Sequence, residues 1–547
     1  MNKFFVFFAS LCVLSCTPKN IEGGVIAPPK PPGPEEPIGQ QVLTYSYPDV
    51  IVADAGQGFL RKSNRYEITV CGEDGVDKPV YVMEDRNSYN QKEGKGVGMG
   101  KFNHIAQFSF DGQVKVKIKR KDGKSLNNVV LYPKKKGYTY TVESDHISIT
   151  LDQWAYIYVE FPDLNMHVAG KCIKEPLFLF ADPLLENVPK KDKWAEVITP
   201  EMTAAEVKEK ILSTPKKTIY FSEGVYDFNE ASVLGNNYSG YQLPLVSNKD
   251  YYIPGGAVIV GSFNSISGQK TDNVRFFGHG IVTAAGKDRL GDAVSIPYNL
   301  YNAGGGTGCV LEGIHFVAPS HFSVLSRGDL YTKFTKMFGW WHQTDGWGGD
   351  EYAVLENSFV KANDDNIKVY RDFQKIKNNI VYKQINGAAI QLGWGEFGAT
   401  KNSVVEDLYI IKDDIKTPSW PSNTAVINLV TNGNEDTQSG STISDNLFKN
   451  IYIESDVQRL FGLNCVGGSI NNITVENMIL DGENMSGENY IVSQFDGKYN
   501  NIKFKNLVIN GTKITSDKGN PNWNMLQKVW VSNKNYSDSN LTTIIYE

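Results

Sequence analysis

The 547-residue chain has few cysteines, no marked excess of charge of either sign, and only one long apolar run. Of its six cysteines, the four after Cys16 (Cys71, Cys172, Cys309 and Cys465) are widely spaced and fit no zinc-binding pattern. Lys and Arg number 55 against 61 Asp and Glu, a net charge of −6, which argues against nucleic acid as a partner. After the first 16 residues no segment is long and apolar enough to cross a membrane as a helix.

The N-terminal segment, residues 1–16, has one lysine followed by an apolar run that ends at Leu14-Ser15-Cys16. It resembles a bacterial lipoprotein signal, in which Cys16 becomes the lipidated first residue; a plain secretory signal cut near Ser15 is the alternative. Residues 17–41 hold seven prolines and predict an extended tether. We therefore expect an extracytoplasmic outer-membrane lipoprotein, on the cell surface or the periplasmic side, that contacts the membrane through its anchor only.

Residues 42–185 alternate apolar and polar side chains over short runs, as in 66–70, 114–118, 147–151 and 155–159. This period of two, interrupted by turns, predicts an antiparallel β-sandwich. In an exported protein, Cys71 and Cys172 of this region either form a disulfide or remain buried free thiols.

Residues 186–547 follow a different pattern. Thr203 and Glu206 form a capping box, which predicts a short helix to Leu212. Beyond it, hexads of the form apolar–x–Asn–apolar–x–apolar recur, with third positions at 313, 336, 357, 378, 407, 450, 477 and 506. The spacing is 20 to 30 residues except for one interval of 43, and each copy has β-branched residues and one turn. This repeat predicts a parallel β-helix whose N-terminal end is capped by the short helix.

Three carboxylates fall at similar offsets within two adjacent repeats: Asp345, Asp364 and Asp365. Since equal offsets stack about 4.8 Å apart in a β-helix, the three should share one face. Acids so close cannot all ionise freely, so at least one pKa should rise and leave a protonated acid beside an ionised base. Cleavage of a glycosidic bond requires that pairing.

Residues suited to binding sugars surround these acids, because aromatic rings cover the CH faces of a sugar while polar groups hold its hydroxyls. The pair Asp413-Asp414 has no aromatic residues gathered near it and predicts a solvated turn. The segment Gly278-His279-Gly280 predicts a tight turn between coils. The predicted substrate-binding residues are Trp340, Trp341, His342, Trp347, Lys368, Tyr370, Asn386, Gln391 and Trp394.

At these residues the chain resembles glycoside hydrolase family 49, the dextranase and isopullulanase group. The matching segments lie within residues 215 to 400: 221–228, 277–282, 344–346, 363–370, 386–387 and 390–394. The resemblance implies a β-sandwich before a right-handed parallel β-helix, and an inverting hydrolase without a metal or other cofactor. It assigns Asp364 as general acid and Asp345 and Asp365 as the residues that hold and activate water. We expect a monomeric, endo-acting enzyme for an α-glucan such as dextran or pullulan.

Three alternatives stay open at this point. The polygalacturonase family shares the Asp-Gly and Asp-Asp elements, but here the Gly-His-Gly lies upstream and no Arg-x-Lys follows Asp365. A β-helix polysaccharide lyase would use Lys368 or Arg371 as a base, with acidic residues holding Ca²⁺. A non-catalytic glycan-binding protein would also suit a tether, sandwich and solenoid, but would not need three clustered carboxylates.

Overall fold

The computed structural model describes residues 41–53, 59–86, 102–167, 171–173, 175–228, 242–285, 299–340, 343–394, 399–414, 424–430, 442–466, 468–482, 485–494, 498–531, 535–537 and 544–547. The predicted signal with Cys16, the tether up to residue 40, Trp341 and His342 lie outside the described residues. Within the described ranges, no helix has both the length and the apolar character that a membrane span requires.

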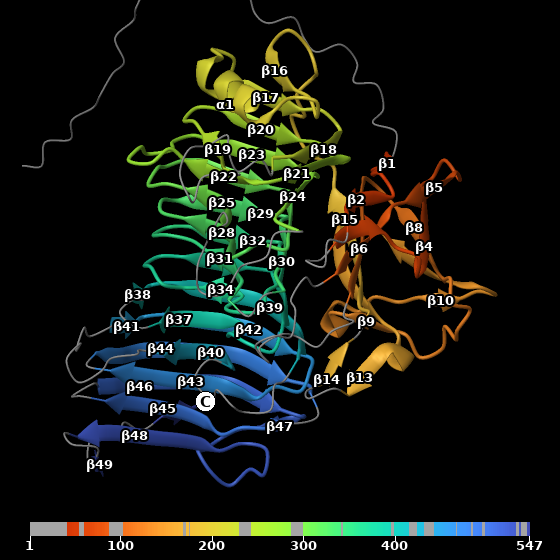
Figure 1. Cartoon of the computed structure of the whole chain (residues 1–547). Helices are drawn as coiled ribbons and strands as arrows, with labels where there is room; N and C mark the ends of the chain where they lie inside the picture. Colours follow the sequence, from red (N-terminus) through yellow and green to blue (C-terminus); the bar gives the residue numbers. More distant parts are fainter. Residues whose placement is uncertain are drawn as a thin grey trace, which may run out of the picture. The chain divides into compact units, whose positions relative to one another are not determined.

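The first part of the chain forms two β-sheets packed face to face (Figure 1). A two-stranded pair, β13 (Asn165–His167) with β14 (Lys171–Ile173), lies apart from both. The larger sheet has the order β2 (Val50–Val52), β3 (Phe59–Lys62), β6 (Val82–Arg86), β7 (Phe102–Phe110), β15 (Leu177–Pro183), β12 (Ala155–Glu160) and β9 (Val130–Tyr132), with β1 (Val42–Thr44) beside β7. The smaller sheet has the order β10 (Thr141–Val142), β11 (His146–Leu151), β8 (Val114–Arg120), β4 (Tyr66–Cys71) and β5 (Asp77–Val80).

The alternating residues of these strands form the core between the two sheets. Ile68 of β4, Val116 of β8 and Ile157 of β12 are all buried in one cluster, which confirms the predicted sandwich. The strand pairs are antiparallel except β7 with β15, which run parallel. Cys71 carries a free thiol, so the unbridged alternative holds.

The second part is a parallel β-helix whose coils follow one another from α1 (Ala204–Ser213) towards the blue strands in Figure 1. Thr203 caps α1 with the predicted capping box. One long sheet holds two strand columns that merge near its end: β16 (Ala195–Ile198), β17 (Thr218–Phe221), β18 (Gly224–Asp227), β20 (Asp250–Ile253), β21 (Ala257–Val260), β23 (Arg275–Gly278), β24 (Ile281–Thr283), β26 (Cys309–Glu312), β27 (His315–Val317), β29 (Leu330–Lys333), β30 (Lys336–Phe338), β32 (Val354–Glu356), β33 (Phe359–Lys361), β35 (Lys375–Lys377), β36 (Ile380–Lys383), β38 (Thr400–Lys401), β39 (Val404–Asp413), β41 (Thr442–Ser444), β42 (Leu447–Ile453), β44 (Ser469–Leu480), β46 (Lys498–Ile509), β47 (Thr512–Lys513) and β50 (Ile545–Tyr546).

The other sheet forms the remaining face of the coils, and this face carries the site described below. Its strands pair in parallel from β19 through β48. They are β19 (Gln242–Leu245), β22 (Ser262–Ser265), β25 (Asn299–Ala303), β28 (Phe322–Ser326), β31 (Asp345–Gly348), β34 (Ile367–Lys368), β37 (Ile390–Trp394), β40 (Ala425–Val430), β43 (Arg459–Val466), β45 (Asn489–Gln494), β48 (Met525–Val531) and β49 (Asn535–Ser537).

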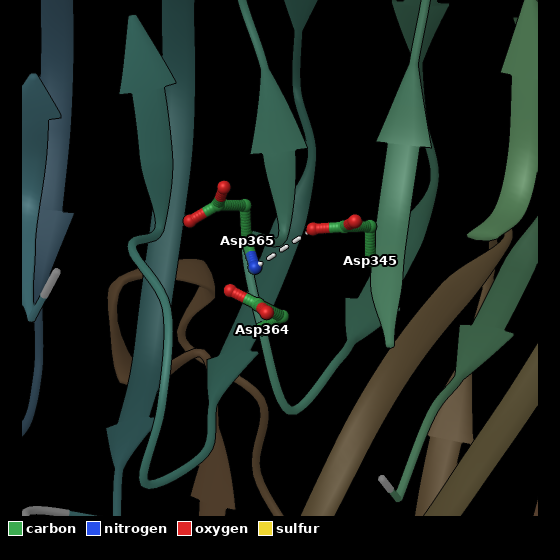
Figure 2. Close-up of side chains that lie close together, drawn as sticks. All are labelled: Asp345, Asp364 and Asp365. Carbon is green, nitrogen blue, oxygen red and sulfur yellow. Dashed lines mark hydrogen bonds between the residues drawn. The ribbon is translucent and has the colours of Figure 1, made fainter. Parts of the chain in front are cut away.

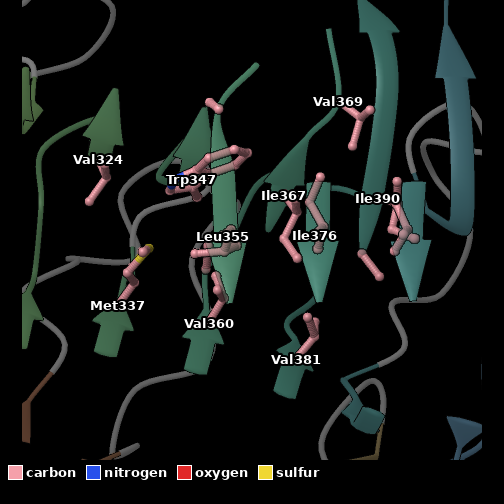
Figure 3. Packing of buried hydrophobic residues seen from close by; sticks show 14 of the residues in the cluster. Val324, Met337, Trp347, Leu355, Val360, Ile367, Val369, Ile376, Val381 and Ile390 are labelled. Carbon is pink, nitrogen blue, oxygen red and sulfur yellow. The ribbon is translucent and has the colours of Figure 1, made fainter. Parts of the chain in front are cut away.

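Apolar side chains from both sheets fill the interior of the coils in stacked rows (Figure 3). Leu355, Ile376 and Val405 occupy paired positions of successive coils and are all buried. Apolar side chains at equivalent positions of successive coils stack about 4.8 Å apart, and the core is therefore continuous along the coils. The predicted fold class, a β-sandwich followed by a parallel β-helix, is confirmed.

The third residue of the hexads turns the chain with a left-handed backbone. Asn357 and Asn378 have φ of 50° and 51°, and the Nδ2 of Asn378 donates to the Oδ1 of Asn357 at 2.7 Å. The predicted position 336 is wrong, because the left-handed residue of that coil is Phe334 (φ 52°) and strand pairing aligns Phe334 with Asn357. Lys336 instead begins β30 and is fully buried.

A buried ion pair joins the two parts of the fold. The Nζ of Lys336 lies 2.9 Å and 2.8 Å from the two carboxylate oxygens of Asp182 on β15, and both side chains are inaccessible to solvent. Tyr156 and Gln107 of the sandwich also donate to Asp182. Because this carboxylate has four donor contacts from three residues, the network fixes β30 against the sandwich.

Candidate active site

Three aspartates converge at the turns that lead into β31 and β34 (Figure 2). Asp345 begins β31, whereas Asp364 and Asp365 lie in the turn before β34. Strand pairing aligns Trp347 with Ile367 and thereby sets Asp345 level with Asp365. One oxygen from each of the three carboxylates lies within 4.8 Å of the others. The structure thus brings together the three acids that the repeat predicted to share a face.

Backbone hydrogen bonds hold two of these carboxylates. The amide N–H of Asp365 donates to the Oδ1 of Asp345 at 3.2 Å, and the N–H of Ala388 donates to the Oδ1 of Asp365 at 3.1 Å. Each carboxylate therefore accepts a hydrogen bond from the backbone of the next coil. The spacing of the coils fixes the orientation of both groups.

Lys368 supplies the positive charge of the cluster. Its Nζ lies 3.0 Å from the Oδ1 of Asp345 and 2.6 Å from the Oδ2 of Asp365, and it donates to the hydroxyl of Tyr370 at 3.3 Å. Burial would lower the pKa of Lys368, but the two carboxylates outweigh burial and raise it well above its usual value. Lys368 therefore stays charged and stabilises the ionised form of Asp345.

The electrostatics separate the roles of the acids. Burial raises the pKa of Asp345 to about 7, with a further contribution from the charge of Asp365 and an opposing one from Lys368. Burial, followed by the charges of Asp345 and Asp365, raises the pKa of Asp364 well above its usual value. The raised pKa favours the protonated form of Asp364, which lies beside two acids that share the charge of Lys368.

A groove of about 800 Å³ lies along the outer face of the strands from β19 to β37. Of the predicted residues, Asp345, Lys368, Tyr370 and Trp394 line it. Its walls also include residues that the sequence analysis did not select, among them Asn299, Asn302, His321, Phe322, Asp350 and Arg371.

His321 and Phe322 sit one coil before the acids. Strand pairing aligns Phe322 with Asp345, and the Nε2 of His321 lies 3.6 Å from the Oδ2 of Asp345. The Nζ of Lys368 lies 5.5 Å from the centre of the Phe322 ring. Extending the repeat register by one coil towards the N-terminus would have found both residues.

Two of the predicted sugar-binding tryptophans do not face the groove. Trp347 is fully buried in the core of the coils and donates its Nε1 to Thr332 at 3.1 Å. Side chains alternate along a strand, and the next residue, Gly348, lines the groove, so the Trp347 indole points inward. Trp340 is 4% exposed and donates its Nε1 to the Oδ2 of Asp85 at 2.7 Å. The predicted sugar contacts of both residues are therefore wrong.

Gln391 and Asn386 also serve the fold rather than line the groove. Gln391 is fully buried, donates to the carbonyl of Gly393 at 2.7 Å and accepts from Asn428 at 3.0 Å. Strand pairing sets it level with Lys368, not with Tyr370 as the offsets predicted. Asn386 donates its backbone N–H to the Oδ1 of Asn363 at 3.3 Å and is partly buried.

The pair Asp413 and Asp414 is buried, not part of a solvated turn. The Nζ of Lys383 lies 3.0 Å from Asp413, and the hydroxyl of Tyr382 donates to Asp414 at 3.0 Å. Burial raises the pKa of Asp413 to about 6, against the charge of Lys383. These acids therefore form an internal polar cluster apart from the groove.

Sandwich residues brace the turn that carries Asp364. Besides donating to Asp85, Trp340 accepts a hydrogen bond on its carbonyl from the Nδ2 of Asn363 at 2.7 Å. Lys361 lies with its Nζ 4.4 Å from the centre of the Trp340 ring and donates to Asn103 of β7 at 2.7 Å. Since Asn363 directly precedes Asp364, these contacts connect the acid to the sandwich.

No protein-family profile matches the chain. A dextranase from Arthrobacter globiformis is 26% identical over 209 residues, 33% of this chain and 30% of that enzyme. An isopullulanase from Aspergillus niger is 22% identical over 470 residues, 78% of this chain and 80% of that enzyme.

The aligned residues span about a third of the length of two Arthrobacter dextranases. Among solved structures, Dex49A from Penicillium minioluteum superposes with a TM-score of 0.72 at 19% identity, and the alignment covers 92% of this chain and 98% of that one. In sequence and in fold, the chain is similar to the dextranases and isopullulanase of glycoside hydrolase family 49.

Proposed function

We propose that the protein is an endo-acting, inverting glycoside hydrolase that cleaves an α-glucan of the dextran or pullulan type. One observation carries this proposal: a carboxyl whose pKa is strongly raised, Asp364, lies beside two carboxylates that share Lys368, next to an open groove. General acid and base groups poised in this way are what hydrolysis of an acetal requires.

In the proposed mechanism Asp364 donates its proton to the glycosidic oxygen while the bond between that oxygen and the anomeric carbon breaks. A water held by Asp345 and Asp365 attacks the anomeric carbon from the opposite face and gives its proton to one of these carboxylates. Exchange with solvent then returns a proton to Asp364. The net reaction consumes one water and leaves one reducing end and one hydroxyl.

The groove supports a polymeric substrate. It is lined by seven consecutive strands, from Gln242 of β19 to Trp394 of β37. Six steps of about 4.8 Å give it a length of about 29 Å. Asp345 and Lys368 lie inside this length rather than at its end, which favours cleavage within a chain.

The test is release of reducing ends from dextran, pullulan, other α-glucans and pectin, by the parent protein and by Asp364→Asn. The proposal expects cleavage of an α-glucan that Asp364→Asn abolishes. Cleavage of pectin alone, or equal rates for both proteins, would defeat it. Unsaturated products that require Ca²⁺ would instead identify a lyase, although the raised pKa of Lys368 makes it a poor base.

The stereochemistry needs its own measurement. Carboxyl groups are usually about 6.5–9.5 Å apart in inverting enzymes and about 5–5.5 Å apart in retaining ones. Here one oxygen of each carboxyl group lies within 4.8 Å of the others, which is nearer to the retaining spacing, so the resemblance to family 49 and not this distance supports inversion. Proton NMR of the first products should show inversion at the anomeric carbon. Retention would contradict the proposed attack by water and would indicate that a carboxylate attacks the anomeric carbon first.

The N-terminal sequence supports a lipid anchor at Cys16, a location in the outer membrane, and contact with the membrane through the anchor alone. Labelled palmitate should enter the parent protein and not Cys16→Ser. Membrane fractionation should find only the parent with the outer membrane. We further propose that the protein is a monomer, which sedimentation of the protein lacking residues 1–41 would test.

A further inference from the structure

A second column of turn residues runs along the coils, on the side where the groove-bearing sheet meets the long sheet. Strand pairing sets these residues level with one another in successive coils. Most coils place an asparagine or aspartate here with a left-handed backbone: Asn248 (φ 62°), Asn273 (φ 52°), Asn402 (φ 57°), Asp445 (φ 56°), Asn472 (φ 52°) and Asn501 (φ 51°).

These side chains hydrogen bond along the column. The Nδ2 of Asn273 donates to Asn248 at 3.1 Å, and the Nδ2 of Asn472 donates to Asp445 at 2.8 Å. Short polar side chains suit this position because they tolerate a left-handed backbone and can hydrogen bond to the equivalent residue of the next coil.

One coil has Gly308 (φ 69°) at this position, and two neighbouring coils have aromatic residues there. Their turn residues are Tyr352 (φ 62°) and Phe373 (φ 59°). The two rings stack with centroids 5.0 Å apart and planes 4° from parallel. Tyr352 is 59% exposed, and a bulky side chain with a left-handed backbone is strained. The fold therefore accepts strain here to hold the exposed Tyr352 ring against the half-buried Phe373 ring.

Packing inside the protein explains the comparable case of Phe334 but not this one. Phe334 also has a left-handed backbone, and its ring meets Trp154 of the sandwich edge-on with centroids 5.2 Å apart. In the part of the chain that the structure describes, the ring contact of Tyr352 is with Phe373. This contact leaves most of the Tyr352 surface open to solvent.

The aromatic pair lies beside the groove. Asp350 and Arg371, which line the groove, each precede one of the two aromatic residues by two positions. The Nε of Arg371 lies 3.3 Å from the Oδ1 of Asp350. The coils that carry the pair are those that carry Asp345 and Lys368. A chain leaving the groove on this side would pass Asp350 and Arg371 and then meet the rings.

We propose that Tyr352 and Phe373 form a sugar-binding platform outside the groove, which takes pyranose units of the polysaccharide remote from the bond that is cleaved. This proposal rests on the proposed function, because it assigns the same substrate chain a further contact. The CH groups of a pyranose ring are apolar and carry slight positive charge, which complements an aromatic surface. Arg371 and Asp350 supply a donor and an acceptor for sugar hydroxyls beside it.

The test replaces each ring with the residue that the column normally uses. Tyr352→Asn and Phe373→Asn keep a side chain that accepts the left-handed backbone, so thermal stability should stay the same or rise. Trp194→Ala is the matched control, because Trp194 is 73% exposed and lies before β16, outside the groove lining.

Binding is measured by affinity electrophoresis in gels containing dextran or pullulan, with every substitution placed in an Asp364→Asn background. The dissociation constant for the polymer should rise about threefold to tenfold for each Asn variant and stay unchanged for Trp194→Ala. In the catalytically competent protein, KM should rise by the same factor for the polymer and not for a trisaccharide cut from it, with kcat preserved.

The outcomes separate the two proposals. Unchanged polymer affinity in both Asn variants, with normal hydrolysis by the parent, would overturn the platform and leave the proposed function standing. Loss of affinity in the Asn variants without any hydrolysis by the parent would support the platform and defeat the hydrolase. An equal rise of KM for polymer and trisaccharide would place the effect in the groove and overturn the platform.

Discussion

The backbone of Asp365 donates to the side chain of Asp345, its counterpart in the preceding coil, at 3.2 Å. One acid of the site is thus oriented by the main chain of another. The carboxyl group of Asp364, the residue before Asp365, lies close to the other two carboxyl groups (Figure 2). This hydrogen bond ties the relative position of Asp345 and Asp365 to the spacing of the coils.

Asp364→Asn should reduce kcat by about a hundredfold to ten-thousandfold, because the amide cannot donate a proton to the leaving oxygen. Release of reducing ends from the best α-glucan substrate measures the effect. Asp445→Asn is the control, since Asp445 is exposed on a turn where other coils carry asparagine. A loss of similar size in both variants would contradict the assignment.

The same Asp364→Asn variant should be more stable than the parent near neutral pH. The pKa of Asp364 is raised in the folded protein, so between the unfolded pKa near 4 and the folded pKa the native state binds the extra proton. The parent therefore loses about 1.4 kcal/mol of stability per pH unit as pH rises through this window, and the amide does not.

Thermal unfolding of both proteins from pH 4 to pH 7 checks this prediction. The difference in Tm should be close to zero at pH 4 and should grow as the pH rises above the unfolded pKa. A constant difference across the range would show that Asp364 does not carry the extra proton.

Lys368→Met should move the acidic limb of the kcat/KM profile to higher pH. Asp345 has a pKa of about 7 and must be ionised to accept a proton from water, so activity rises as pH increases through that value. Lys368 lowers the pKa of Asp345, and its removal therefore raises it. Lys377→Met, at an exposed lysine of β35, should leave the profile in place. A drop in kcat with an unmoved profile would argue against this electrostatic role.

Trp340→Phe should lower kcat about tenfold with little change in KM, because it removes the indole N–H that holds Trp340 to Asp85 and so loosens the turn before Asp364. Loss of this hydrogen bond to a buried carboxyl should also cost about 1.5–3 kcal/mol of stability. Steady-state kinetics and denaturant unfolding measure the two effects. An unchanged kcat despite the loss of stability would show that the hydrogen bond between Trp340 and Asp85 stabilises the fold but does not position Asp364.

The sequence pattern predicted the β-helix well because the same residue type, asparagine, recurs at one turn position of the repeat. Asn357, Asn378 and Asn450 each have a left-handed backbone, and asparagine is the ordinary residue that tolerates it. The repeat failed where Phe334 replaces asparagine, since a phenylalanine carries no signal for such a turn. The contact of Phe334 with Trp154, distant in sequence, determines that position.

The three acids could be predicted, but most of their surroundings could not. Offsets counted from the hexads ignore the lengths of the turns, which place Gln391 rather than Ala389 opposite Lys368. The inward direction of Trp347 depends on where its strand begins after a turn of variable length. The role of Trp340 depends on Asp85, some 255 residues earlier in the chain.

The buried pair of Lys336 and Asp182 has a consequence for how the protein can be made. Without the sandwich, the coils would enclose an ammonium group that has lost its counter-ion, and removing one partner of such a pair is strongly destabilising. The N-terminal region leaves the ribosome first and presents Asp182 before Lys336 is synthesised. We therefore expect residues 186–547 expressed alone to accumulate as insoluble chains.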